Sequence, residues 1–195
     1  MVELGKLTLI TGPMWSGKTT ELLRLFDRKT RASLKCLLVK HGIDNRYGEN
    51  LVSTHTNIEG YSNKVQALSC ELISNIYDKI TISDYNTIFV DEIQFFADKT
   101  KCLDILKLGI DVVVAGLNGD WKQEMFPDMT KLFSCASDIR LLTAICGVCR
   151  KNEACYTSKI CTTASQIDVG GADKYIPTCL YCKIKNDELM KINDN

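Results

Sequence analysis

Short apolar runs alternate with amphipathic stretches over the first two thirds of the chain. Residues 7–10 and 35–40 have the composition of buried strands, and between them leucines and a phenylalanine recur at helical spacing. The strand-like pattern returns at 87–90, 111–115 and 139–145, and the helical spacing at 68–77, 101–108 and 127–136. Strands that alternate with helices in this way predict an α/β fold with a parallel sheet flanked by helices.

The pattern loosens between residues 41 and 60. This segment is polar and rich in turn residues, so it predicts an irregular excursion with a short hairpin. It contains His55, one of only two histidines. A loop histidine without metal-binding neighbours is more often solvated than a ligand.

The segment between the first strand and the first helix satisfies the phosphate-binding pattern G-x-x-x-x-G-K-[ST] at every fixed position. It consists of Gly12, Pro13, Met14, Trp15, Ser16, Gly17, Lys18 and Thr19. Glycines let backbone N–H groups approach phosphate closely, and the following helix adds the positive end of its dipole. Lys18 then suits the β- and γ-phosphates of a nucleotide, and the Thr19 hydroxyl suits a bridging magnesium ion. A chance glycine-rich turn is the weaker alternative.

Two carboxylates, Asp91 and Glu92, follow the apolar strand at 87–90. At the carboxyl end of a central parallel strand, such residues face the ligand crevice, one toward the metal ion and the other toward the reaction. In isolation, a strand that ends in a solvated acidic turn would be the commoner case. Beside a phosphate-binding loop, the catalytic interpretation is favoured.

A glycine-bearing loop at 116–121 follows the strand at 111–115 and is expected at the same edge of the sheet. Its Trp121, like Trp15, Phe95 and Phe96, carries a ring that could stack on a planar ligand. Core packing is the more frequent role of any single aromatic residue, so both interpretations stay open at this point.

The chain contains two C-x-x-C pairs after residue 145. They are Cys146 with Cys149 and Cys179 with Cys182. Four thiolates in two such pairs predict a closed tetrahedral zinc site, which is structural because no position remains for water. Redox-active or merely buried cysteines are the weaker alternative. The remaining cysteines lack such pairing and are expected to be buried or half-buried: Cys36, Cys70, Cys102, Cys135, Cys155 and Cys161.

The segment between the two cysteine pairs contains two adjacent glycines within residues 162–175. A flexible segment that is anchored at both ends to a zinc-bound base predicts a lid over a ligand rather than a plain surface loop. We therefore divide the chain into an α/β domain at 1–142 and a zinc-binding domain with this loop at 143–195.

Composition limits the partners and the compartment. The 195 residues include 24 Lys+Arg and 24 Asp+Glu, so the formal net charge is zero and gives no basic field for nucleic acid. No apolar run approaches the roughly 18 residues of a membrane span, and the first strand begins too early for a secretory signal. We expect a cytoplasmic protein with reduced cysteines and a small partner molecule.

Taken together, these motifs resemble those of the cytosolic-type (type II) thymidine kinase family. The resemblance covers residues 7–183 and rests on these elements in the expected order: Gly12 to Leu22, Asp91 to Phe96, Leu117 to Trp121, the two cysteine pairs, and Gly170 to Tyr175. It implies a RecA-like sheet with a zinc-bearing lasso loop, and transfer of the ATP γ-phosphoryl group to the 5′-hydroxyl of thymidine or deoxyuridine. It also implies Mg²⁺ and structural Zn²⁺ as cofactors and a homotetramer, with neither nucleic acid nor a membrane as partner.

The resemblance further implies a role for each matching residue. Glu92 would be the general base that accepts the proton of the 5′-hydroxyl. ATP and magnesium would be held by Gly12, Pro13, Met14, Trp15, Ser16, Gly17, Lys18, Thr19, Thr20, Asp91 and Gln94. The nucleoside would be bound by Met14, Phe95, Leu117, Trp121, Thr157, Asp168, Val169, Gly170, Gly171 and Tyr175.

Several positions depart from the pattern of many relatives. Thr56 stands where an aspartate near the metal is common, so that role is vacant or passes to another group such as Asp44. Ile93 replaces a common glycine. Trp121 replaces a phenylalanine or tyrosine, which is a conservative change for stacking.

Two other functions stay open beside thymidine phosphorylation. One is a related kinase with a broader or shifted range of deoxynucleosides. The other is a RecA-like ATPase whose cysteine region contacts DNA through a modest set of cations: Arg150, Lys151, Lys159, Lys174, Lys183 and Lys185. The zero net charge argues against the second.

Overall fold

The computed structural model describes residues 3–43, 51–53, 64–82, 84–160 and 174–193. The chain forms two compact units, which we treat separately. The first comprises 1–10, 18–116 and 127–140, and the second comprises 11–17, 117–126 and 141–195. The domain boundary expected at 142/143 stays a prediction.

A six-stranded sheet is the main element of the fold, with the strand order β5-β2-β6-β7-β1-β8. Its strands are β1 (Leu7–Gly12), β2 (Cys36–His41), β5 (Leu68–Cys70), β6 (Thr87–Val90), β7 (Asp111–Leu117) and β8 (Asp138–Leu141). Strand β2 pairs in parallel with β5 and β6, and β6 pairs in parallel with β7. All four residues of β6 are buried, as expected for a central strand covered on both faces.

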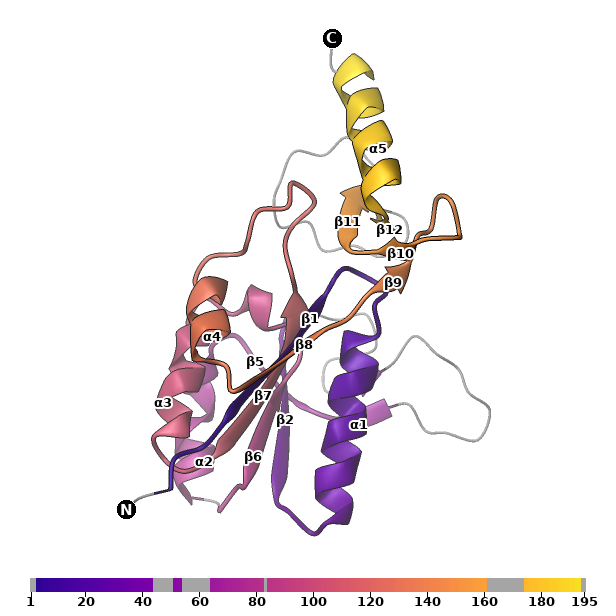
Figure 1. Cartoon of the computed structure of the whole chain (residues 1–195). Coiled ribbons are helices and arrows are strands. Elements are labelled where there is room, and N and C mark those ends of the chain that lie inside the picture. The colour runs from indigo at the N-terminus through magenta and orange to yellow at the C-terminus, as the bar shows by residue number, and fades with distance from the viewer. Residues whose placement is uncertain (1–2, 44–50, 54–63, 83, 161–173, 194–195) are drawn as a thin grey trace. The chain divides into compact units, whose positions relative to one another are not determined.

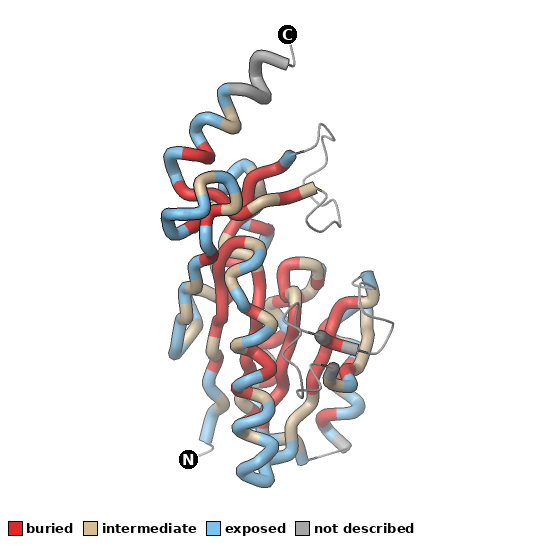
Figure 2. The backbone as a smooth tube through the Cα atoms, turned by 90° about the vertical axis from the view of Figure 1, so that its right-hand side faces the viewer, coloured by how far each residue is buried: buried red, intermediate tan, exposed pale blue. Residues whose placement is uncertain are grey.

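Helices flank the sheet of the first unit on both faces, with α1 on one side and α2 to α4 on the other (Figure 1). They are α1 (Lys18–Arg31), α2 (Tyr77–Ile82), α3 (Cys102–Leu106) and α4 (Met129–Cys135), with 3₁₀ turns η1 (Ile73–Ile76), η2 (Ile93–Phe95) and η3 (Lys99–Lys101). Helix α1 buries three leucines, and its Phe26 ring packs edge-on against Phe89 of β6 with centroids 5.3 Å apart. Figure 2 shows the buried backbone concentrated in the strands. The predicted α/β fold is confirmed.

The helix predicted over 68–77 is wrong in its first part. Leu68–Cys70 instead forms the edge strand β5, in which Ser69 is level with Lys40 of β2. The turn η1 begins only at Ile73, where the carboxylate of Asp98 accepts the N–H groups of Ile73 and Ser74 at 2.7 and 2.9 Å. Strand pairing and an acidic cap from a distant residue therefore override the local periodicity.

One strand of an antiparallel pair, β3 (Leu51–Ser53), lies within the excursion predicted at 41–60, and its partner β4 (Lys64–Gln66) lies just beyond it. Residues 44–50 and 54–63, which include Asp44, His55 and Thr56, lie outside the described residues. Among the helices that the structure describes, none is long and apolar enough to cross a membrane.

The second unit is built from very short strands and one helix. Strand β9 (Ala144–Ile145) pairs with β10 (Glu153–Ala154), and β11 (Tyr156–Lys159) pairs with β12 (Tyr175–Thr178), both antiparallel. Helix α5 (Leu180–Asn193) follows β12. The single strand predicted at 139–145 is in fact β8 and β9 with a break between them, and the sequence did not reveal β10 to β12 or α5.

The expectation that the unpaired cysteines are shielded holds for Cys102, which is buried, and for Cys36 and Cys70, which are half-buried. It is wrong for Cys135 and Cys155, which are exposed. Cys135 is the last residue of α4, and Cys155 joins β10 to β11, so one lies at the end of a helix and the other between two strands. Cys161 lies outside the described residues.

Candidate functional site

The phosphate-binding motif begins at the last residue of β1, Gly12. A Cβ atom at this position would lie 2.4 Å from the carbonyl oxygen of Leu142 and 2.7 Å from Ser16 Oγ, so no larger residue fits. Ser16 Oγ donates a hydrogen bond of 2.9 Å to the Pro13 carbonyl. The loop is therefore held in shape by the Ser16 side chain, and Leu142 packs closely against its first residue.

Two residues of the loop, Trp15 and Gly17, have left-handed backbones with φ of 66° and 82°. Glycine adopts this conformation freely, whereas a tryptophan there is uncommon. Left-handed residues in a loop turn backbone N–H groups toward one side, which is how anion-binding concavities form. Such strain at a non-glycine residue is typical of ligand-binding loops.

Helix α1 starts at Lys18 directly after this loop and is 14 residues long. Its first turn carries Lys18, which is buried, and Thr19, which is half-buried. The N–H groups at a helix start have no partner within the helix, and the dipole is positive there. Both features favour a bound phosphate at this end of α1.

The Thr19 hydroxyl connects α1 with the carboxyl end of β6. It lies 3.2 and 3.1 Å from the two carboxylate oxygens of Asp91, a residue that is 4% exposed. The first unit therefore brings together the two predicted magnesium ligands, which are 72 residues apart in sequence. Hydroxyl and carboxylate oxygens are ligands that Mg²⁺ accepts, usually together with water and phosphate.

Glu92, the predicted base, follows Asp91 in a left-handed conformation with φ 51° and ψ 47°. For a residue other than glycine this costs about 1–2 kcal/mol, and such residues cluster at functional sites. The turn η2 follows, and Gln94 of this turn donates from Nε2 to Glu92 Oε2 at 2.6 Å. Gln94 is 3% exposed. The structure thus pairs Gln94 with the candidate base.

Among the candidate nucleoside contacts in the second unit, Met14 and Thr157 are joined. The backbone N–H of Met14 donates to Thr157 Oγ1 at 3.1 Å. Thr157 on β11 and Tyr175 on β12 are both buried. Leu117 is half-buried, and so is Phe95 in the first unit. Asp168, Val169, Gly170 and Gly171 lie outside the described residues.

Three lysines surround Trp121 in the second unit. The ammonium groups of Lys122 and Lys159 lie 5.1 and 5.3 Å from its ring centroid. Lys183 Nζ donates to the Trp121 carbonyl at 2.8 Å and also pairs with Asp187. The distances from Lys122 and Lys159 lie within the range of cation–π attraction, so both lysines help to hold the Trp121 ring in place.

Sequence reasoning missed this role of Lys159 and Lys183 and counted them as surface cations. They are only 2% and 4% exposed, so they cannot belong to a solvent-facing basic stripe. The interpretation as a DNA-contacting ATPase therefore loses two of its six cations. No sequence signal marks either lysine as buried. Phe96 is likewise a core residue, fully buried with its ring edge-on to His41 at 4.8 Å.

The four paired cysteines converge in the second unit. The sulfur atoms of Cys146, Cys149, Cys179 and Cys182 all lie within 4.8 Å of one another, and those of Cys149 and Cys179 are 3.9 Å apart. Tetrahedral zinc with Zn–S bonds of about 2.3 Å places its sulfur ligands about 3.8 Å apart. The geometry fits a four-thiolate zinc site. Asn152 Nδ2 lies 3.7 Å from the Cys179 sulfur as an outer partner.

The protonation of these thiols also fits a cation site. Burial raises the pKa of Cys146, but backbone N–H groups of Cys149, Cys179 and Val148 outweigh it and lower the pKa to about 6. Burial, together with the neighbouring thiols, raises the pKa of Cys182 to about 12. The thiols therefore cannot all ionise together unless a cation compensates their charge, as a bound metal does.

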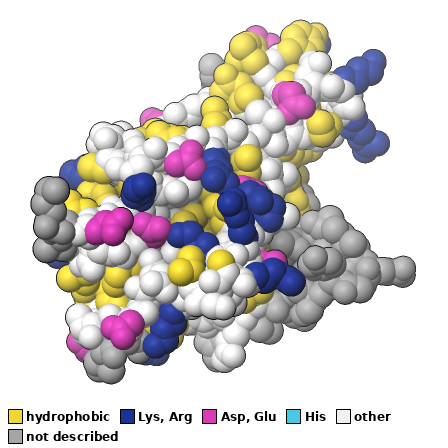
Figure 3. Space-filling model, turned by 60° about the horizontal axis from the view of Figure 1, so that its bottom comes forward, with side chains coloured by type: hydrophobic (Ala, Val, Ile, Leu, Met, Phe, Trp, Pro, Cys, Tyr) yellow, Lys and Arg dark blue, Asp and Glu magenta, His cyan; other side chains and the backbone are white. Residues whose placement is uncertain are grey.

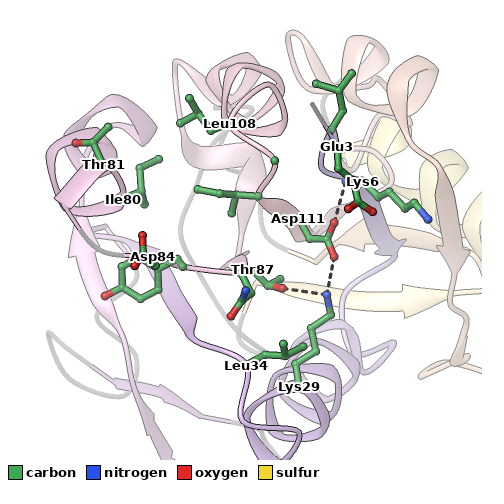
Figure 4. Close-up of a pocket in the computed structure, with 15 residues that line it drawn as sticks. Glu3, Lys6, Lys29, Leu34, Ile80, Thr81, Asp84, Thr87, Leu108 and Asp111 are labelled. Carbon is green, nitrogen blue, oxygen red and sulfur yellow. Dashed lines mark hydrogen bonds and ion pairs between the residues drawn. The ribbon is translucent and has the colours of Figure 1, made fainter. Parts of the chain in front are cut away.

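A hollow lies at the amino ends of the strands of the first unit, where Figure 3 shows side chains of both charges on one face. Apolar residues including Leu34, Ile80 and Leu108 line it, and Lys29 Nζ bridges Asp111 at 2.8 Å and Thr87 at 2.9 Å (Figure 4). The backbone N–H of Lys6 donates to the same aspartate at 3.0 Å. Because these groups satisfy each other, we assign no ligand to this hollow.

The chain is similar to known proteins over almost its entire length. Residues 5–183 match the thymidine kinase family. The chain is 37% identical to a thymidine kinase of Fowlpox virus over 186 residues, which is 93% of this chain and 98% of the relative. It is 38% identical to a thymidine kinase of Pseudothermotoga lettingae, covering 91% of this chain and 94% of the relative.

A third relative, thymidine kinase 1 of Dictyostelium discoideum, is 37% identical over 91% of this chain and 77% of its own length. Similarity of this extent leaves no part of the phosphate-binding loop, the acidic strand end or the cysteine pairs outside the match. The chain belongs to the thymidine kinase family.

Proposed function

We propose that the protein transfers the γ-phosphoryl group of ATP to the 5′-hydroxyl of thymidine or deoxyuridine and releases the 5′-monophosphate and ADP. Membership of the family supports a kinase that uses ATP and Mg²⁺. The observation that carries the assignment is the contact between the Thr19 hydroxyl and the Asp91 carboxylate. It joins the first turn of α1, which follows the phosphate-binding loop in sequence, to an acidic strand end, and Glu92 is the next residue.

In the proposed reaction, Gly12 to Gly17, Lys18 and Thr20 bind the phosphates of ATP, and Thr19 and Asp91 hold the magnesium ion, which neutralises charge on the phosphates. Positioning and charge stabilisation then supply most of the rate, because phosphoryl transfer needs little covalent help from the protein.

Glu92 accepts the proton of the 5′-hydroxyl as the nucleoside oxygen attacks the γ-phosphorus. The bond from that phosphorus to the β,γ-bridging oxygen breaks, and ADP leaves with the electron pair. A carboxylate in this role must lie within hydrogen-bond reach of the hydroxyl. Its position next to the metal-binding aspartate meets the need for base and metal ion in one site.

The nucleoside is proposed to contact Met14, Phe95, Leu117, Trp121, Thr157 and Tyr175, together with backbone groups of Asp168 to Gly171. Hydrogen bonds from a lid to the edge of the base would select pyrimidines, because a wrong base leaves buried polar groups unpaired. The four cysteines are proposed to hold structural zinc at the base of that lid. A homotetramer and a cytoplasmic location stay predictions.

The test is phosphate transfer from labelled ATP, with magnesium, to thymidine, deoxyuridine, deoxycytidine and deoxyguanosine. The wild-type chain is expected to label thymidine and deoxyuridine. Glu92→Gln should lower kcat by about 10²–10⁴-fold, because general-base catalysis contributes on that scale. Binding of ATP should persist, since the phosphate-binding loop is unchanged.

Glu188→Gln is the matched control, since Glu188 is an exposed glutamate on α5. It should retain full activity. Transfer to deoxycytidine or deoxyguanosine in preference to thymidine would replace the proposed substrate by another deoxynucleoside. Full activity of Glu92→Gln would remove Glu92 from the role of base.

A further inference from the structure

The Gln94 side chain contacts Glu92, the candidate base. Its Nε2 donates to Glu92 Oε2 at 2.6 Å. That is shorter than the usual 2.9 Å of an N–H···O hydrogen bond. The Glu92 carboxylate therefore accepts a short hydrogen bond from an amide two residues along the chain.

The backbone conformation after β6 explains how the Gln94 side chain contacts Glu92, only two residues before it. Glu92 is left-handed, and the turn η2 closes directly after it, with the Phe95 N–H donating to the Glu92 carbonyl at 3.1 Å. This turn folds the chain sharply at the end of β6. It places the amide of Gln94 beside the carboxylate of Glu92.

The neighbouring strand β7 comes close to the Gln94 amide. Val90, the last residue of β6, is level with Val114 of β7, and Gly116 lies two residues further along β7. A Cβ atom at Gly116 would lie 2.9 Å from Gln94 Oε1 and 2.6 Å from Ile93 Cγ2. The backbone of β7 thus comes close to the Gln94 side chain, and only glycine leaves room for the amide in this position.

Burial makes this arrangement rigid. Gln94 is 3% exposed and Ile93 is fully buried. A buried amide has few alternative rotamers and must keep its hydrogen bonds. Since the amide holds Oε2, the rotation of the carboxylate about its last bond is fixed, and the direction of Oε1 is fixed with it.

From these contacts we infer that Gln94 is a positioning residue, which orients the Glu92 carboxylate so that Oε1 faces the hydroxyl proton of the substrate. This rests on the proposed function, in which Glu92 is the base. It differs from the role that the family resemblance implied for Gln94, which was contact with ATP. A proton transfer depends on the direction of the accepting oxygen, and a displacement of about 1 Å can cost about 10²-fold in rate.

The test is steady-state kinetics of Gln94→Met, which keeps the length of the side chain and removes the donor. We expect kcat to fall about 10- to 100-fold while KM for ATP and for thymidine changes less than about 3-fold. Asn86→Ala is the control. It removes an amide whose Oδ1 accepts from the Lys35 N–H at 2.8 Å, at the opposite end of the same strand, and should leave kcat unchanged.

A double variant separates a positioning role from a general loss of structure. If Gln94 acts through Glu92, adding Gln94→Met to Glu92→Gln should lower kcat by less than about 2-fold, because the group it orients is already neutralised. A structural role would instead lower the activity of both backgrounds by the same factor. Multiplying effects would therefore overturn the inference.

Other outcomes are equally decisive. A rise in KM for ATP with unchanged kcat would return Gln94 to nucleotide binding and overturn the inference, and so would wild-type kcat in Gln94→Met. If the wild-type chain phosphorylates no nucleoside, the proposed function fails and the inference with it. Should Gln94→Met not fold, the smaller Gln94→Leu, which also lacks the donor and adds no charge, is expected to show the same loss of kcat.

Discussion

The two units of the chain are stabilised in different ways. The first has a central strand, β6, with every residue buried, and helices on both faces of its sheet. The described core around the cysteines in the second unit consists of five small residues: Ala144, Cys146, Ala154, Cys179 and Cys182. Such a core buries too little apolar area to hold strands of two to four residues by itself.

The comparison teaches that the sheet of the first unit rests on hydrophobic packing, whereas the cysteine region of the second is proposed to depend on a metal ion. Buried apolar area supplies roughly 25 cal/mol for each Å² removed from water, and the sheet offers many such residues. Structural zinc can supply apparent binding free energies of about 10 kcal/mol or more where a core cannot. Removing either source should therefore affect one unit far more than the other.

The largest effect is expected from removing the metal ion. Cys149→Ser, or a strong zinc chelator, should abolish zinc binding and expose the amides of 144–160 and 174–193 to hydrogen exchange. The amides of β2, β6 and β7 should stay protected, because their core contains no cysteine pair. Peptide-resolved hydrogen exchange combined with metal analysis measures both.

Cys135→Ser is the control for this change, because Cys135 is exposed and unpaired in the described structure. It should bind zinc as the wild type does. Full protection of 144–160 in a metal-free Cys149→Ser chain would show that packing suffices there, and the comparison would break down.

The reciprocal change is Phe89→Ala in β6. Phe89 is fully buried and packs against Phe26, so the cavity should cost about 3–5 kcal/mol in the free energy of unfolding of the sheet. The zinc content should stay at one ion per chain. Urea unfolding followed by circular dichroism gives the first quantity and metal analysis the second.

Leu108→Ala provides the matched truncation, because Leu108 is 51% exposed and should cost less than about 1 kcal/mol. Loss of zinc in folded Phe89→Ala would mean that the cysteine region depends on the sheet core as well.

The smallest effect is expected at the amino ends of the strands, where Lys29 pairs with Asp111. Burial raises the pKa of Asp111, but the Lys29 ammonium and the Lys6 N–H outweigh it and hold that pKa below its ordinary value of 3.8. A lowered pKa means that the stabilisation is complete above the unfolded value and is lost as pH falls through the folded one.

Both side chains are about one third exposed, so Asp111→Asn should cost only about 0.5 kcal/mol at pH 7. The difference in Tm from the wild type should shrink below about pH 4. Thermal unfolding from pH 7 to pH 3 checks this. A difference that grows in acid would contradict the assigned direction.

Long, strongly patterned segments could be predicted from the sequence, and so could motifs with fixed spacing. The strands at 87–90 and 111–115, the loop at Gly12 to Thr19 and the four cysteines all follow from periodicity or spacing. The contact between Thr19 and Asp91 also follows, since parallel strands and their loops bring such residues to one edge.

Other features depend on tertiary contacts that no local pattern encodes. Strand β5 exists because β2 offers an edge, although its own residues have helical spacing. The strands β9 and β10 have two residues each, which is too short for a period to show. Burial of Lys159 and Lys183 depends on Trp121, which lies 38 and 62 positions away. The bond from Gln94 to Glu92 depends on a left-handed residue that propensity disfavours.

The close approach of Gly116 to Gln94 has a consequence for mutations in the Gly116 codon. Every single-nucleotide missense change in a glycine codon adds a side chain, and at this position even one carbon would press on Ile93 and on the Gln94 amide. All such alleles would disturb the same amide whatever residue they encode. We therefore expect this codon to tolerate fewer missense changes than codons for exposed residues.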